Sequence, residues 1–126
     1  MCFYRVSKYQ KAEQDIVCYK IMELDNNNGL HSLIYQTCIT YYPGSKIRAH
    51  TKLSWFKKRN VELINALDKL NGEVVHSVID YHTAFMRKYS PEVIVKCIIP
   101  KGEYYWVNHR NGEYASLSLK IIEIGH

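Results

Sequence analysis

The sequence predicts a single α+β domain built on a mixed, mostly antiparallel sheet with two short helices. Three observations lead to this fold class. Segments rich in β-branched and aromatic residues recur at strand length, and Asn-Gly or Pro-Gly turns follow several of them. Two central segments instead repeat their apolar residues every three or four positions, as helices do. The chain has 126 residues, of which 47% are hydrophobic, and this is ample for one core.

The N-terminal third predicts a β-hairpin after a loose lead-in at residues 1–14. Residues 15–24 are expected to form the first strand, because residues such as Ile16 and Tyr19 favour strands. The Asn-rich stretch 25–29 must turn, since Asn and Gly tolerate left-handed backbone conformations. The remaining elements expected here are a returning strand over residues 30–41, a turn at Pro43 and Gly44, and a short strand over residues 46–50.

Two short helices are expected in the middle of the chain. The first covers about residues 60–70, where Asn60 can cap the N-terminus and apolar residues recur every three positions. The second runs from its cap Asp80 to Tyr89, directly before a Ser-Pro break. The stretch between the two helices is expected to be extended.

The C-terminal part predicts a series of strands. Residues 93–99 carry apolar side chains on both faces, which is typical of a central strand covered on both sides. A Pro-Lys-Gly turn leads to a short aromatic strand at residues 103–106, and an Asn-Gly turn leads to residues 113–116 and a closing strand at 117–124. The apolar alternation of that last strand slips at Ile122 and Ile124, which predicts either a β-bulge or a strand buried on both faces near its end.

Positive charge gathers in one segment of the chain. No acidic residue occurs between Asp25 and Glu62, whereas six cations fall there; the other eleven cations are matched by twelve acids. A cluster of this kind can hold an anionic partner such as nucleic acid, a nucleotide or an acidic protein surface. The alternative is a solvated surface that only keeps the protein soluble. The candidate partner-binding residues are Lys46, Arg48, Lys52, Trp55, Lys57, Lys58 and Arg59.

Catalytic signatures are lacking in the sequence. It has no glycine-rich phosphate loop, no dinucleotide fingerprint and no nucleophile elbow. The four cysteines do not have the spacing of a zinc site, so we expect buried free thiols, no metal and no cofactor. If the protein were an enzyme, His76, Tyr105 and Glu113 are the residues that could line a cleft, since histidine and carboxylate groups serve as acids and bases.

The C-terminal sequence Val95-Lys-Cys-Ile-Ile-Pro-Lys-Gly102, followed by Tyr104-Tyr105 and Gly112-Glu-Tyr-Ala-Ser116, resembles a family of small uncharacterised proteins from bacteria, bacteriophages and other mobile elements. Those proteins carry a Gly-Phe-His-Ser-like segment where this chain has Val74-Val75-His76-Ser77. Their usual Asp-Lys after Ala-Ser is Leu117-Ser118 here. The resemblance covers the last third of the chain and the first strand. It implies an accessory protein of a phage or mobile element, without an established activity.

Two functions from different classes are therefore expected. The first is a non-catalytic binding or accessory protein, whose basic segment engages an anionic ligand or a protein partner. The second is a small ADP-ribosyltransferase-like or nucleotide-binding domain, which is an analogy at the level of the fold. Nucleic acid is an open alternative as partner, although no nucleic-acid motif accompanies the basic segment, and self-assembly through a sheet edge is another. Because the sequence shows neither a membrane helix nor a signal peptide, we expect a cytoplasmic protein.

Overall fold

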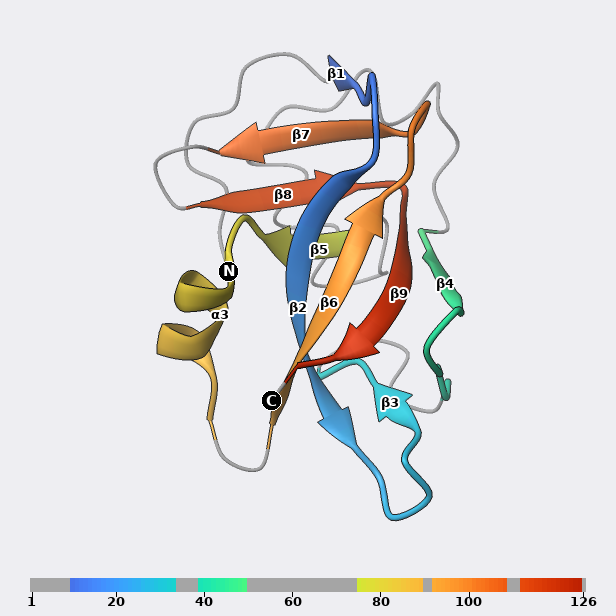
Figure 1. The fold of residues 1–126 in the computed structure, drawn as a ribbon, viewed down its shortest axis with the longest axis vertical. Helices are drawn as coiled ribbons and strands as arrows, with labels where there is room; N and C mark the ends of the chain where they lie inside the picture. Colours follow the sequence, from blue (N-terminus) through green and yellow to red (C-terminus); the bar gives the residue numbers. More distant parts are fainter. Residues whose placement is uncertain (1–9, 34–38, 50–74, 90–91, 109–111, 126) are drawn as a thin grey trace.

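Strands dominate the computed structural model, which describes residues 10–33, 39–49, 75–89, 92–108 and 112–125. These residues contain nine strands and one helix (Figure 1). The elements are β1 (Gln10–Lys11), β2 (Ile16–Leu24), β3 (Leu30–His31), β4 (Lys46–Arg48), β5 (Val75–Val78), α3 (Tyr81–Arg87), β6 (Val93–Ile99), β7 (Tyr104–Asn108), β8 (Glu113–Ser116) and β9 (Ser118–Ile124).

The strands form one sheet in the order β1-β7-β8-β5-β2-β6-β9-β4, and β3 pairs with the end of β2. All of these pairings are antiparallel. The longest ladder joins β2 to β6 over seven residue pairs, from Ile16 opposite Ile99 to Met22 opposite Val93. By contrast, β2 meets β5 at one residue pair, Tyr19 opposite Val78. The sheet therefore has a narrow junction between β5 and β2.

The sheet bends at this junction, and its two parts run in different directions. Figure 1 shows β5, β7 and β8 lying across the direction of β2, β6 and β9. In each strand, alternate residues face the same side of the sheet. The residues on one of these sides, from strands of both parts, form one core. The buried members of this core are Ala12, Cys18, Met22, Leu30, Tyr41, Ile47, Val75, Val95, Cys97, Ile99, Leu119 and Ile121. Most of the described core residues therefore come from the strands of the sheet.

The helix α3 packs on the other face of the sheet. Its N-terminus is capped by Asp80, whose carboxylate oxygen Oδ1 accepts a hydrogen bond of 2.7 Å from the Thr83 backbone N–H. Ala84 is the buried residue of the helix and packs in a small cluster with Val78 and Ile94. The helix has seven residues. In the described part of the chain, no helix is long and apolar enough to span a membrane.

The expected fold class was wrong. The described residues form a β-rich fold, with 53% of them in strands and 9% in a helix, rather than an α+β fold with two short helices. Among the described residues the one helix, α3, is only two turns long, whereas the strands of the sheet supply most of the buried core residues. The second expected helix is confirmed at Tyr81–Arg87, whereas the helix expected over residues 60–70 lies outside the described residues.

The expected returning strand over residues 30–41 was also wrong as a continuous element. Leu30 and Tyr41 pair with each other, through two backbone N–H···O bonds of 2.8 Å. Twelve residues of one extended strand would span roughly 36 Å, so its two ends cannot be hydrogen-bonded partners. β3 accordingly ends at His31, and the chain returns at Tyr41.

Several local predictions are confirmed. Ser45 N–H bonds to Tyr42 O at 2.8 Å across the Pro43-Gly44 turn, and Gly44 has the positive φ of 92° that favours glycine. Of the two alternatives expected for the last strand, the structure shows the bulge. Glu123 is opposite Lys96 and Ile121 is opposite Cys97, so Ile122 is the extra residue between them. Part of the expected lead-in is ordered, because Gln10–Lys11 form β1.

Candidate anion-binding edge

The strand β4 brings two residues of the predicted basic segment to the end of the sheet. Lys46 and Arg48 are exposed, and Ile47 between them is buried in the core. This alternation follows from the two-residue repeat of a strand, which sends successive side chains to opposite faces. Lys46 and Arg48 therefore share the outer face of the sheet. The other candidates, Lys52, Trp55, Lys57, Lys58 and Arg59, lie outside the described residues.

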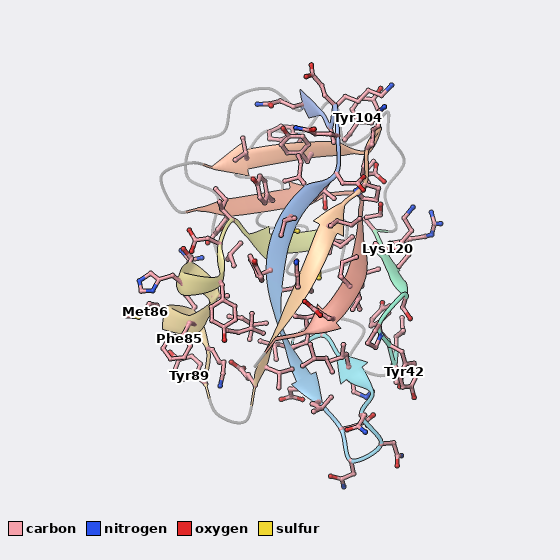
Figure 2. All side chains as sticks on the ribbon, viewed as in Figure 1. Tyr42, Phe85, Met86, Tyr89, Tyr104 and Lys120 are labelled. Atoms are coloured by element: carbon pink, nitrogen blue, oxygen red, sulfur yellow. The ribbon has the colours of Figure 1, made fainter. Side chains whose placement is uncertain are left out.

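A third cation joins them from the C-terminal end of the chain. Lys120 of β9 is exposed and stands directly opposite Lys46 in the β4–β9 ladder. Figure 2 shows Lys120 on the same side of the molecule as β4. We call Lys46, Arg48 and Lys120 the basic edge. Apolar residues alternate with Lys120 in the sequence, at Leu119 and Ile121, and this pattern indicates that the Lys120 side chain points outward. The sequence does not indicate that β4 is the strand that pairs with this segment.

The register brings the Lys46 and Lys120 side chains close together. Ile121 N–H bonds to Ser45 O at 2.9 Å and Ala49 N–H bonds to Leu117 O at 2.8 Å. Because ladder bonds fall on alternate residues, the 46–120 pair is of the non-hydrogen-bonded kind, in which opposite side chains are closest. Like charges in such positions repel each other and destabilise the pairing. An anion bound between them would relieve this repulsion.

Among the described residues, no acid pairs across the sheet with a member of the basic edge. The cross-strand neighbours of Lys46, Arg48 and Lys120 are one another, Ser118 and Ile98. Glu103 lies next to Ser118, the residue opposite Arg48. Its carboxylate accepts hydrogen bonds from the Ser118 hydroxyl and from the Tyr104 N–H. That carboxylate is thus engaged by neutral donors. Within the described residues, no salt bridge joins an acid to the basic edge.

Two residues of the alternative catalytic hypothesis, Tyr105 and Glu113, lie on opposite faces of the sheet. Glu113 faces the same side as its cross-strand partner Val78, which is the side covered by α3. Tyr105 pairs with Ser116, three residues further along β8, and so lies on the opposite face. His76 is placed only through its backbone, opposite Ala115. A site that needs both Tyr105 and Glu113 on one face is therefore not formed.

Glu113 is instead part of a buried ion pair. Its side chain is 2% exposed, and Arg87 Nη1 donates to its Oε1 at 2.6 Å. The second carboxylate oxygen, Oε2, is buried and accepts no hydrogen bond from the described residues. Arg87 is the last residue of α3, so the pair links the C-terminal end of the helix to the start of β8.

Tyr105 has a structural setting near the N-terminal strand. Its hydroxyl donates to Gln10 Oε1 at 3.0 Å, and its ring makes an edge contact with Tyr114 at a centroid distance of 5.8 Å. Burial raises the pKa of the Tyr105 phenol, and the negative charge of Glu13 raises it further. A phenol with a raised pKa stays protonated near neutral pH, and so it is a poor base there.

Two of the four cysteines belong to the core of the sheet. Cys18 of β2 and Cys97 of β6 are opposite each other, fully buried and not joined by a disulfide. Burial raises the pKa of the Cys18 thiol to about 11, and it also raises that of Cys97. Since the thiolate is the reactive form, both thiols are inert near neutral pH. Cys2 and Cys38 lie outside the described residues.

Comparisons with protein-family models, with curated proteins and with solved structures found no match to this chain. The resemblance to small mobile-element proteins therefore stays a prediction from the sequence.

Proposed function

We propose that this chain is a non-catalytic binding protein, an accessory protein of the phage or mobile-element type that acts in the cytoplasm. Its basic edge engages an anionic or protein partner. The observation that carries this proposal is the convergence of Lys46, Arg48 and Lys120 on one exposed face, where none of their described cross-strand neighbours is an acid. Two strands far apart in the sequence contribute these cations.

The energetics of the edge support a binding role. Cross-strand pairs of like charge destabilise a sheet by roughly 0.2–1 kcal/mol relative to neutral pairs. Lys46 and Lys120 form a directly opposite pair of like charges of this kind. A bound anion changes the sign of the interaction, because each ammonium group then has an opposite charge nearby. Such binding weakens as salt increases, since the groups are exposed and screened.

Charge reversal tests the proposal directly. We expect the triple variant Lys46→Glu/Arg48→Glu/Lys120→Glu to lose retention on immobilised heparin and on polyglutamate, measured as the salt concentration needed for elution. The matched control is Lys11→Glu/Lys88→Glu/Lys101→Glu, which makes the same change in net charge elsewhere on the described surface. If both triple variants elute at the same salt concentration, retention reports net charge alone and the basic edge has no special role.

The alternative of an ADP-ribosyltransferase-like or nucleotide-binding domain has its own test. Tyr105 and Glu113 lie on opposite faces of the sheet, and this arrangement does not favour an enzyme that uses both side chains. A rise in melting temperature on addition of NAD or nucleotides, measured with the wild-type protein, would favour it over the binding role proposed above.

A further inference from the structure

We propose that the partner of the basic edge is an extended acidic polypeptide segment, which adds to β4 as a further strand of the sheet. This inference rests on the proposed function and narrows its anionic partner to one chemical class. It combines two features of β4, namely the main-chain groups along its outer side and the charges of its side chains.

The main chain of β4 offers hydrogen-bonding groups on its outer side. Ser45, Ile47 and Ala49 direct their backbone groups toward β9, as the bonds Ile121 N–H to Ser45 O and Ala49 N–H to Leu117 O show. Alternate residues of a strand direct these groups to opposite sides. The N–H and C=O groups of Lys46 and Arg48 therefore point away from β9. Within the described residues, no strand pairs with this side of β4.

The side chains of β4 specify which strand can fit there. Lys46 and Arg48 lie on the outer face, so acidic residues two positions apart on an added strand would stand beside them. Lys120, which lies opposite Lys46 on β9, adds a second positive charge near the acidic residue beside Lys46. Ile47 points to the core side, so the residue between the two acids would face the core rim and should be apolar. The expected sequence pattern is acidic, apolar, acidic.

Other occupants fit these features less well. A second copy of β4 would place Lys46 and Arg48 against the same two cations, and lysines on edge strands commonly prevent such self-pairing. Nucleic acid would contact the cations through phosphate groups, but it has no regular row of amide and carbonyl groups to pair with the β4 main chain. An acidic strand satisfies both the charges and the main-chain groups, as in recognition by strand addition.

The experiment compares two substitutions at one position. Lys46→Ala removes the charge and keeps the backbone N–H, whereas Lys46→Pro also removes the N–H that points away from β9. Proline is tolerated at such a position, because no ladder bond to β9 is lost. The probe is a fluorescent peptide of alternating Glu and Val, with binding measured by anisotropy. Heparin serves as a polyanion that cannot add as a strand.

We expect Lys46→Ala to weaken peptide binding, and Lys46→Pro to weaken it by about a further fivefold, the equivalent of one hydrogen bond. Heparin retention should be the same for both variants. A second measurement covers the case in which Lys46→Pro does not fold. A peptide N-methylated at the residues whose N–H groups face β4 should bind the wild-type protein more weakly than its unmethylated form.

The outcomes separate this inference from the proposed function. Equal peptide affinity of the alanine and proline variants, or of the two peptides, overturns strand addition while charge-dependent heparin retention still supports the basic edge. If the triple charge reversal of the basic edge leaves heparin and peptide binding unchanged relative to its matched control, the proposed function itself fails. Strong retention of the protein on heparin, together with weak peptide binding that N-methylation does not change, would point to a polyanion such as nucleic acid instead.

Discussion

At the α3 side of the sheet, the buried carboxylate of Glu113 is neutralised within the molecule by Arg87, at 2.6 Å. At the β4 side, three exposed cations lie next to one another, and none of their cross-strand neighbours in the described part of the chain is an acid. Figure 2 shows these as opposite sides of the molecule, with Phe85 and Met86 of α3 on one side and Lys120 on the other. The Glu113 carboxylate thus has an opposite charge beside it, whereas no ion pair joins the three cations to an acid among the described residues.

This difference separates a structural role from a binding role. A charge taken out of water needs a partner inside the protein, and the partner of Glu113 is Arg87. Removal of Arg87 should therefore lower the free energy of unfolding. Exposed charges that repel each other contribute nothing favourable to the fold. Their removal should therefore act on binding and leave stability unchanged or improved. Four predictions test this division.

The largest effect is expected at the buried pair. Arg87→Met should destabilise the protein by about 2–3 kcal/mol, because Glu113 is then left buried without its cation. The value is below that of a fully buried pair, since Arg87 retains 33% exposure. Urea unfolding measures the change. Retention on heparin should not change at a temperature at which the variant is folded.

The controls for this prediction are Lys88→Met and a double variant. Lys88 is adjacent to Arg87, and its substitution should change stability by less than 0.5 kcal/mol or so. The double variant Arg87→Met/Glu113→Leu should recover part of the loss, because no buried charge remains. If Arg87→Met is as stable as wild type, the pair does not hold α3 to β8.

A smaller effect is expected at two turn glycines with matching geometry. Gly44 and Gly102 have φ values of 92° and 91°, and a Cβ at either position would meet no atom within 4 Å. Alanine should therefore destabilise each variant by about 1–2 kcal/mol through backbone strain alone. Gly44 precedes β4, so Gly44→Ala should also weaken binding to the basic edge. Gly102→Ala should not, and equal binding losses in the two variants would contradict the assignment of the edge.

The third prediction concerns Lys120, where stability and binding should change in opposite directions. Lys120→Glu converts the like-charge pair with Lys46 into a pair of opposite charges, and should stabilise the protein by up to about 1 kcal/mol at low salt. The same change should weaken retention on heparin. Lys101→Glu is the control, because Lys101 lies in the turn between β6 and β7. A loss of stability in Lys120→Glu would show that the lysine has a structural role.

The smallest effect is expected at a second internally paired charge, in the hairpin. The pKa of Asp25 is lowered chiefly by the hydrogen bond from His31 Nε2 at 2.7 Å, and also by those from the N–H groups of Gly29 and Asn27. A lowered folded-state pKa gives a stabilising contribution that is complete above the ordinary value of 3.8 and is lost as the pH falls through the folded value.

Asp25→Asn should accordingly flatten the loss of stability on acidification. The measurement is the urea midpoint between about pH 6 and pH 2, with Glu13→Gln as the control at an exposed acid. A midpoint curve of Asp25→Asn that runs parallel to that of the wild type would show that the Asp25 contacts do not contribute to folding.

Short-range features of this chain were predictable from the sequence. The strand at Ile16–Leu24, the cap Asp80, the turn at Gly44 and the bulge at Ile122 all follow from residues adjacent to them. Each depends on local physics: side-chain alternation, capping, or the freedom of glycine to adopt positive φ. The exposure of Lys46 and Arg48, which are part of the candidate site, follows from the same alternation.

Long-range features were decided by the tertiary structure. The partner of Lys46 is 74 positions away in the chain, at Lys120, and the partner of Glu113 is Arg87. Neither pairing has a local signal, because strand order and register depend on how the whole sheet buries its apolar face. The fold class was misjudged for the same reason. Residue patterns indicate which segments are strands, but only the assembled chain shows that these strands join into one bent antiparallel sheet.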